Sequence, residues 1–270
     1  MMANLGDFNP DTDMVAFGDM LEIDRWIIAR TNELVKQCLE AYDEYEFHMV
    51  YHNINKFCTI DLSKLYIDMT KDRLYVEKAD SLARRSGQSA LYTVLSAITR
   101  LLAPVISFTA EEIWKSMPHS ASDKAESVFL NDMPVYDEAF AKENESLISK
   151  WDEMLTARDD VMKALEQARA NKMIGKSLDA KVIVYTENSD IYKSLSDFAG
   201  ELTTVYITSG AEVVLGAAPE GAFTETATGI AVVVANADGH KCDRCWSYST
   251  EGVHDEEGGF ICERCRKIIE

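Results

Sequence analysis

Apolar residues recur with the period of an α-helix through most of the first 173 residues. One such stretch covers residues 21–45, and a second, with a wide apolar face, covers about 47–71. A third starts near residue 81 and contains Pro104, which should kink it or split it in two. A fourth covers about 143–173. Because short connections link these stretches, the pattern predicts an up-and-down bundle of long helices whose apolar faces bury one another.

The fourth helical stretch runs into a Gly-Lys-Ser sequence at 175–177, which resembles the end of a phosphate-binding loop. Ala170 stands where such a loop has its first glycine, and a helix rather than a strand precedes it. The cradle of backbone amides that holds a phosphate therefore cannot form. We expect Gly175 instead to end the helix in a left-handed C-cap.

The periodicity changes beyond the bundle. Short runs rich in β-branched residues, bounded by Gly, Asn and Asp, lie at 180–186, about 202–208, 212–215 and 229–235. Residues 191–199, between the first two runs, have a helical pattern. These features predict four strands with a helix, which form a small α/β domain.

Two Cys-x-x-Cys pairs stand near the end of the chain, Cys242 with Cys245 and Cys262 with Cys265, separated by sixteen residues. Each pair can turn a tight knuckle whose thiolates point the same way, and together they complete a tetrahedron around Zn²⁺. Because thiolates fill all four positions, no place remains for a reactive water. The spacing therefore predicts one structural zinc ion, which supplies folding energy to a short segment.

Two other interpretations of these cysteines compete with zinc. Two disulfides would suit an oxidising compartment, and a four-thiolate iron site has similar spacing. Small residues usually crowd such an iron site, whereas Trp246 and Arg266 follow the second cysteine of each pair here. The residues favour zinc.

These patterns together predict a mainly α chain with four parts. A connecting segment (1–20) precedes the helical bundle (21–178), which is followed by the small α/β domain (179–237) and a C-terminal four-cysteine zinc-binding module (238–270).

Composition and charge limit the classes of function that the chain can have. The chain is 47% hydrophobic and 27% charged, as expected of a packed globular protein, and its net charge is −19. Such a charge argues against nucleic-acid binding through a bulk positive field, so any such contact must be local. Residues 1–13 lack the apolar core of a signal peptide, and Arg100 interrupts the most apolar stretch. We expect a cytoplasmic protein that neither spans nor binds a membrane.

The bundle carries two basic clusters, Lys71 with Arg73 and Arg84 with Arg85. Acidic residues surround both clusters, so they form either solvated ion pairs or contacts to phosphates. We find no nucleophile with an evident partner and no pair of carboxylates placed for acid/base chemistry. The chain by itself does not look catalytic.

Several motifs of the bundle resemble the anticodon-binding helical domain of the class I isoleucyl, valyl and leucyl tRNA synthetases. They are Asp24-Arg-Trp-Ile27, Asp61-Leu-Ser63, Tyr66-Ile-Asp-Met-Thr-Lys-Asp-Arg-Leu-Tyr75, Arg84-Arg85, Leu102-Ala-Pro104 and Phe108-Thr-Ala-Glu-Glu-Ile-Trp114. Ile174-Gly-Lys-Ser-Leu-Asp-Ala180, followed by the zinc-binding module, is similar to the bacterial isoleucyl members specifically.

This resemblance implies a C-terminal piece of a larger synthetase. The family activates its amino acid on a domain with HIGH and KMSKS motifs, which this chain lacks together with the editing domain. ATP would bind only to that absent catalytic domain, and this piece alone should be inactive. The implied partners are the anticodon stem-loop of isoleucine tRNA and the rest of the synthetase chain, and we expect a monomer.

The resemblance also makes the zinc-binding module a candidate RNA surface. Trp246 is the candidate for stacking on an unpaired base, or it packs the knuckle onto the α/β domain. Cations that could hold phosphates surround it: Lys241, Arg244, Arg264, Arg266 and Lys267. The alternatives are a zinc-ribbon module on a helical scaffold that contacts protein, and the corresponding part of a valyl or leucyl synthetase.

Overall fold

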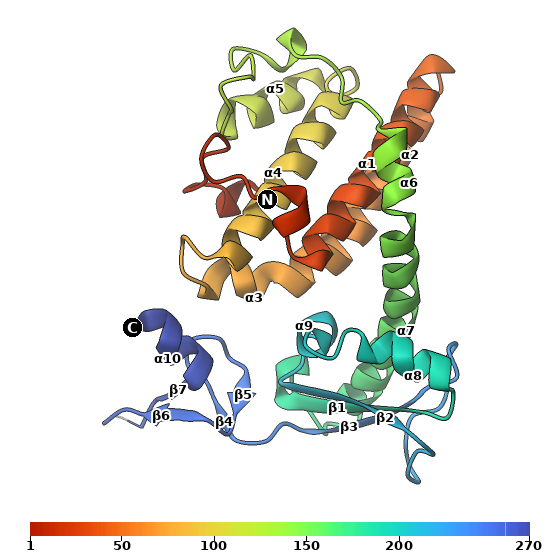
Figure 1. Ribbon diagram of the computed structural model, residues 1–270, viewed down its shortest axis with the longest axis vertical. Helices are drawn as coiled ribbons and strands as arrows, with labels where there is room; N and C mark the ends of the chain where they lie inside the picture. Colours follow the sequence, from red (N-terminus) through yellow and green to blue (C-terminus); the bar gives the residue numbers. More distant parts are fainter. Residues whose placement is uncertain (257) are drawn as a thin grey trace. The chain divides into compact units, whose positions relative to one another are not determined.

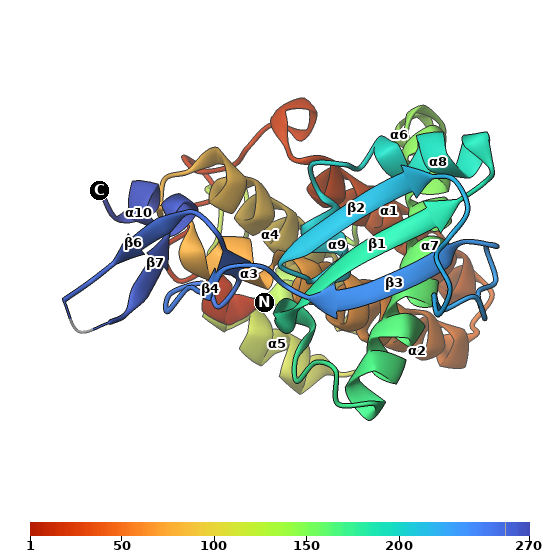
Figure 2. The ribbon, with the colours of Figure 1, turned by 90° about the horizontal axis from the view of Figure 1, so that it is seen from below.

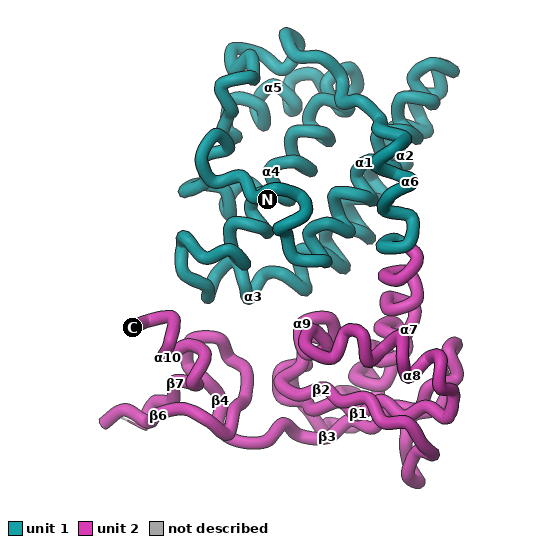
Figure 3. The backbone as a smooth tube through the Cα atoms, in the orientation of Figure 1, with its two compact units in different colours: residues 1–148 teal, residues 149–270 magenta. Residues whose placement is uncertain are grey.

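A computed structural model describes residues 1–256 and 258–270 of the chain. The chain forms two compact units, residues 1–148 (unit 1) and 149–270 (unit 2), which are coloured separately in Figure 3. Among the described residues, no helix combines the length and apolar character that crossing a membrane requires. Each unit is described by itself.

Unit 1 is helical, as the apolar periodicity predicts. Its helices are α1 (Glu22–Asp43), α2 (Phe47–Lys56), a π-helix (Phe57–Ile67), α3 (Asp68–Val76), α4 (Leu82–Leu102), α5 (Ser107–Ser116) and α6 (Glu138–Glu143). Short 3-10 turns lie at Met2–Asn4, Phe17–Asp19 and Val128–Leu130. Helix α1 packs against α2 and α4 (Figure 1). Helix α7 (Glu145–Ala170) begins in unit 1 and lies mostly in unit 2.

Two features of the sequence shape these helices. Pro104 splits the third predicted stretch into α4 and α5, as expected of a residue without a backbone N–H. The second predicted stretch is continuous through α2 and α3, but its middle eleven residues form the π-helix. The wider winding still buries Leu62, Leu65 and Tyr66 on one side, so the apolar face persists.

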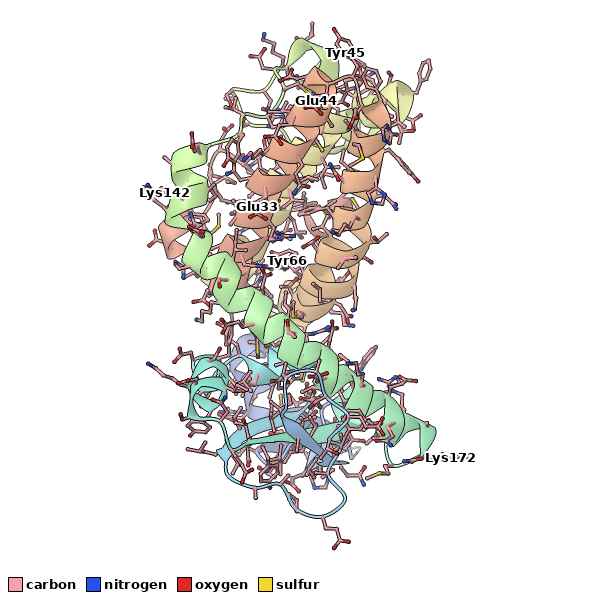
Figure 4. All side chains as sticks on the ribbon, turned by 90° about the vertical axis from the view of Figure 1, so that its right-hand side faces the viewer. Glu33, Glu44, Tyr45, Tyr66, Lys142 and Lys172 are labelled. Carbon is pink, nitrogen blue, oxygen red and sulfur yellow. The ribbon has the colours of Figure 1, made fainter. Side chains whose placement is uncertain are left out.

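A buried carboxylate ties four helical segments of unit 1 together. Asp24 of α1 is fully buried, and its Oδ1 accepts hydrogen bonds from Tyr66 Oη and Arg73 Nη2, each at 2.6 Å. Its Oδ2 accepts a hydrogen bond from Ser86 Oγ of α4. Figure 4 labels Tyr66 between the helices. Burial and the neighbouring Asp24 raise the pKa of Tyr66, so its hydroxyl keeps its proton and donates to the carboxylate.

Unit 2 contains a small three-stranded sheet with the order β2-β1-β3 (Figure 2). Its strands are β1 (Ala180–Thr186), β2 (Gly210–Leu215) and β3 (Ala231–Asn236), and its short helices are α8 (Ser189–Ser196) and α9 (Leu202–Tyr206). Strand β2 runs parallel to β1, and β3 runs antiparallel to it. Alternate residues of β1 are buried, as the period-2 pattern of one strand face requires.

The prediction of a strand at about 202–208 is wrong, because this run forms α9. Its buried residues Leu202, Val205 and Tyr206 have the i, i+3, i+4 spacing of one helix face. The β-branched composition suggested a strand, but the apolar spacing decides the local structure. The helix ends at Ile207, which adopts a left-handed conformation (φ 56°).

The predicted C-cap of the fourth helical stretch is also placed wrongly. Helix α7 ends at Ala170, and Lys172 rather than Gly175 takes the left-handed conformation (φ 57°). Lys172 N donates to Arg169 O at 3.0 Å and Met173 N donates to Ala168 O at 2.9 Å, which is the Schellman pattern. The backbone amide of Gly175 donates instead to Asp179 Oδ2.

The remaining chain forms the zinc-binding module. It has two small antiparallel pairs, β4 (His240–Lys241) with β5 (Tyr248–Ser249) and β6 (Gly252–His254) with β7 (Phe260–Cys262). Helix α10 (Glu263–Ile269) follows. The predicted domain boundaries at 178/179 and 237/238 stay predictions, and the two compact units divide the chain differently, within α7.

Asp160 of α7 anchors the loop before β3 and gives a testable pH dependence. Its carboxylate accepts hydrogen bonds from Ala227 N, from Thr228 N and Oγ1, and from Lys163 Nζ, all at 2.8–3.0 Å. Burial alone would raise the pKa of Asp160, but these donors outweigh it and lower the pKa to about 2. The pKa is lower in the folded protein, so this stabilisation is present above pH 3.8 and is lost as the pH falls toward 2.

We expect Asp160→Asn to lower the free energy of unfolding by about 1–3 kcal/mol at pH 7, because a buried acceptor is lost. The difference from the wild type should shrink between about pH 4 and pH 2, where the carboxylate protonates. Urea unfolding followed by near-UV circular dichroism measures both. Asp152→Asn, at an exposed position on the same helix, is the control. A difference that does not change with pH would contradict this role for Asp160.

Candidate metal centre and adjoining surface

The four cysteines of the two Cys-x-x-Cys pairs come together in unit 2. Their Sγ atoms all lie within 4.8 Å of one another, and all four residues are buried. Cys245 Sγ and Cys262 Sγ are 3.8 Å apart. A tetrahedron with Zn–S bonds of ~2.3 Å has edges of roughly 3.8 Å, so this separation fits thiolates that share one zinc ion. None of the four is in a disulfide, whose sulfurs would lie at ~2.05 Å.

The electrostatics of the cluster also fit a cation. Burial alone would raise the pKa of Cys242, but backbone N–H groups of Cys245, Cys262 and Arg244 lower it to about 6. Burial and the negative charge of Cys245 raise the pKa of Cys265. Four thiolates this close together would repel one another, and a divalent ion at their centre would supply the opposing positive charge.

Local backbone structure holds each cysteine in place. In the first knuckle, Cys242 N donates to Ser247 O and Trp246 N donates to Cys242 O, both at 2.9 Å. In the second, Cys262 ends β7 and caps the N-terminus of α10, and its backbone N–H points at Cys242 Sγ (3.4 Å). Figure 1 shows β4, β7 and α10 side by side, which places both knuckles around one point.

Asp243 fastens the two knuckles to each other. Its N–H donates to Phe260 O at 2.9 Å, and its carboxylate accepts a hydrogen bond from Phe260 N at 2.8 Å. Phe260 is buried at the start of β7. The carboxylate of Asp243 is therefore engaged with the backbone, next to the sulfur cluster.

Trp246, directly after the first cysteine pair, has an unusual conformation for its size. Its backbone is left-handed (φ 66°), a region that glycine enters freely and bulky residues avoid. Its side chain is 60% exposed, whereas Trp26, Trp114 and Trp151 are at most 1% exposed. An exposed ring on a strained backbone gains little packing energy from the rest of the chain.

The predicted cations of the module differ in exposure and in their ion-pair partners. Lys241 and Arg264 are exposed, and Arg244 is half-buried. Arg266 pairs with Glu263 at 2.8 Å and with Glu270 at 2.6 Å, and Lys267 lies 3.5 Å from Glu263. The last turn of α10 is therefore partly neutralised by its own acids.

The basic clusters of the bundle are engaged within unit 1. Arg73 is the partner of buried Asp24, and Lys71 pairs with Asp68 at 2.6 Å on the surface. Arg84 Nη2 lies 3.0 Å from both carboxylate oxygens of Asp7. Arg85 lies 3.4 Å from Asp13 and 3.7 Å from Asp7. Ion pairing, one of the two interpretations of these clusters, accounts for all of these contacts; phosphate contacts stay a prediction.

The structure brings a further cation to the site that the sequence analysis did not single out. Lys176 Nζ lies 5.9 Å from the centroid of the Trp246 ring. In sequence, Lys176 belongs to the segment interpreted as a helix stop, seventy residues from Trp246. The sequence signal that could have identified it is its place in the Ile174–Ala180 motif, one of the motifs that carry the family resemblance.

Comparisons with known proteins give two family matches. Residues 24–184 match the anticodon-binding domain of tRNA ligases. Residues 239–268 match a zinc finger found in FPG and IleRS. The second match contains all four cysteines of the cluster and Trp246.

Similar proteins include three bacterial isoleucine–tRNA ligases. The identities are 42% over 274 residues for Caldanaerobacter subterraneus subsp. tengcongensis, 41% over 269 for Syntrophotalea carbinolica and 43% over 270 for Desulforamulus reducens. Each match covers 100% of this chain but only 28–29% of the relative. The chain therefore spans less than a third of the length of these relatives.

Proposed function

Because the chain belongs to the anticodon-binding family of the tRNA ligases, and is similar over its whole length to isoleucine–tRNA ligases, we propose that it docks the anticodon stem-loop of isoleucine tRNA. It would do so as the C-terminal part of a bacterial isoleucine–tRNA ligase. Docking at this end would hold the distant acceptor end of the tRNA at the catalytic domain. ATP-dependent attachment of isoleucine would take place there, in a part of the ligase outside this chain, which would be inactive alone.

In this proposal the zinc ion is structural. Cys242, Cys245, Cys262 and Cys265 would hold it in a closed tetrahedral site without a water ligand. The bound ion supplies folding energy and a rigid knuckle rather than a reaction step. The zinc-finger match and the geometry of the four sulfurs support one such ion.

The observation that carries the proposal is the exposed, left-handed Trp246. Unpaired bases of RNA loops are recognised largely by stacking on aromatic rings, and phosphates are held by Arg and Lys. A ring fixed by a metal knuckle loses little conformational freedom when a base stacks on it. Lys176 and the cations of the module, Lys241, Arg244, Arg264, Arg266 and Lys267, would hold the neighbouring phosphates.

The bundle cations contribute less in this proposal. Arg73 holds a buried carboxylate, and Lys71, Arg84 and Arg85 are in ion pairs within unit 1. An exposed pair such as Lys71 with Asp68 is worth little, so Lys71 can exchange its partner for a phosphate. A cytoplasmic, monomeric ligase with no membrane partner is part of the same proposal. The alternatives, a protein-interaction module or part of a valyl or leucyl ligase, are not favoured by the relatives found.

Trp246→Gly tests the proposal because it should change the affinity for tRNA without unfolding the zinc-binding module. Glycine adopts a positive φ freely, so the zinc-binding module should keep its metal and gain up to about 1 kcal/mol of stability. Loss of one stacked base should weaken binding of isoleucine tRNA roughly 5- to 150-fold, the equivalent of ~1–3 kcal/mol. Filter-binding titration gives the affinity, and metal analysis gives the zinc content.

Two further variants complete this test. Trp246→Phe retains an aromatic face and should recover much of the affinity. Phe108→Ala removes another exposed ring, 89% exposed on α5, and should leave the affinity unchanged. If Trp246→Gly keeps its zinc and binds isoleucine tRNA as tightly as the wild type, the proposed function is wrong.

A further inference from the structure

A hollow opens beside Trp246 where three parts of unit 2 meet. The lining residues include Arg169 at the end of α7, Lys172, Ile174 and Asp179 after α7, Asn236 at the end of β3, and Tyr248 of β5. Its volume is about 540 Å³, and it is widely open to solvent. Figure 4 labels Lys172 just beyond the end of α7.

The hollow and the Trp246 ring are neighbours. Tyr248, which lines the hollow, lies two residues after Trp246 in the first knuckle. Lys176, whose Nζ lies 5.9 Å from the Trp246 ring centroid, follows Gly175, another lining residue. A nucleotide next to a base stacked on Trp246 would therefore lie near the hollow.

The walls of the hollow are fixed to one another. Ser209 Oγ donates to Leu178 O at 2.6 Å and accepts a hydrogen bond from Tyr248 N at 2.8 Å, which joins the loop after α7 to the zinc-binding module. Ala237 N donates to Asp179 O at 2.7 Å, which joins β3 to the same loop. The hollow is therefore preformed, and a ligand pays little ordering entropy on entry.

The lining has the chemistry of a nucleotide site. Arg169 and Lys172 carry positive charge, and Asp179 is the one carboxylate among the lining residues in the described part of the chain. Asp179 Oδ2 already accepts hydrogen bonds from the amides of Gly175 (3.1 Å) and Lys176 (2.7 Å). The hollow is thus locally positive on a chain of net charge −19, which favours a phosphate at this wall.

Two other lining residues, Asn236 and Tyr248, have groups that can recognise a base. Asn236 offers an amide that donates and accepts, and Tyr248 offers a ring and a hydroxyl. Buried Ile174 gives an apolar floor. Arg169 pairs with Glu166, which is 71% exposed; such a surface pair is weak and can be exchanged for a phosphate.

We propose that this hollow binds one unpaired nucleotide of the RNA strand that stacks on Trp246, with its phosphate on Arg169 and Lys172 and its base edge on Asn236 and Tyr248. This inference rests on the proposed function and adds a second recognition position to it. The stacked base on Trp246 supplies affinity for any base, because every base has an aromatic face. The hollow supplies discrimination between bases.

Lys172→Gly tests the phosphate contact. Lys172 is exposed with a left-handed backbone, so glycine should leave the fold intact and remove one cation. We expect the affinity for a synthetic anticodon stem-loop of isoleucine tRNA to fall several-fold. The slope of log affinity against log salt should decrease by about 0.7–0.9, the value for one phosphate contact. Lys193→Ala, an exposed lysine on α8 outside the hollow, should change neither quantity.

Asn236→Ala tests the base contact. It removes hydrogen bonds without removing charge, so the affinity should fall about 5- to 100-fold with an unchanged salt slope. Single bases of the unpaired loop are then substituted in turn. At one position of the loop, we expect the substitution to reduce the affinity of Asn236→Ala less than it reduces the affinity of the wild type.

The results that would contradict the nucleotide site can be distinguished from those that would contradict the proposed function. If Trp246→Gly weakens binding but Lys172→Gly and Asn236→Ala bind as the wild type does, the hollow is not a nucleotide site and the proposed function stands. If Trp246→Gly has no effect either, the proposed function falls and the inference falls with it. If Asn236→Ala changes the affinity by the same factor whichever base of the loop is substituted, the hollow does not discriminate between bases.

Discussion

Replacing Cys262 with serine should reduce the zinc content of the chain from about one ion to about zero and unfold the module at residues 238–270. A serine hydroxyl does not ionise near neutral pH, so it cannot replace the thiolate that closes the tetrahedron. Residues 238–270 have a small core of their own, built around Phe260 and the four cysteines. Structural zinc sites of this kind contribute roughly 10–16 kcal/mol, far more than such a core can supply.

The effect of Cys262→Ser should be confined to the zinc-binding module. The helices of unit 1 bury their own apolar faces, so the far-UV circular dichroism signal should fall only slightly. Hydrogen exchange should become fast at β4–β7 and α10 and stay slow at α1 and α4. Cys58→Ser, at a free cysteine outside the cluster, is the matched control and should keep its zinc. Full zinc content in Cys262→Ser, or loss of the helical signal, would contradict this assignment.

The second large effect is expected from Asp24→Ala in unit 1. The substitution leaves the guanidinium of Arg73, 13% exposed, without its carboxylate. It also removes the acceptor for the hydroxyls of Tyr66 and Ser86. Removing one partner of a buried ion pair typically costs about 3–5 kcal/mol, because the remaining charge is uncompensated. We expect a loss of this size in the free energy of unfolding of unit 1.

Helix α3 provides a matched control for this prediction. Lys71 and Asp68 form an ion pair whose side chains are 51% and 40% exposed. Removing it by Asp68→Ala should cost roughly 0–0.5 kcal/mol, because water screens the pair. Urea unfolding of the two variants under one set of conditions compares a buried pair that joins α1 to α3 with an exposed pair within α3. Similar losses for both variants would show that the Asp24 network does not hold the helices together.

The positions of α7 and of the sheet strands could be predicted from the sequence because the repeat of apolar residues in each depends only on neighbouring positions. Residues 145–170 repeat every three to four positions, and β1 alternates every two. Composition alone misled at 202–208, where β-branched residues suggested a strand. There the spacing of Leu202, Val205 and Tyr206 lets α9 bury one face, and burial outweighs intrinsic preference.

The zinc ligands could be predicted from the sequence for a different reason. The backbone of each Cys-x-x-Cys pair forms a tight turn that brings its two thiols together. The metal ligands can therefore be recognised from two short segments of sequence. The sulfur separation of 3.8 Å, however, arises only when β7 and the first knuckle pack together through Asp243 and Phe260. The sequence indicated which atoms could bind the metal, and the tertiary structure placed them at bonding geometry.

By itself, the sequence determined the long helices, the sheet strands β1, β2 and β3, the metal and the family resemblance. The tertiary structure alone decided that Trp246 is exposed with a left-handed backbone, that Lys176 approaches it, and that Asn236 and Tyr248 share a hollow with Lys172. The physical reason is distance along the chain. Periods and metal-binding pairs depend on residues a few positions apart, whereas a recognition surface depends on side chains that long-range packing brings together.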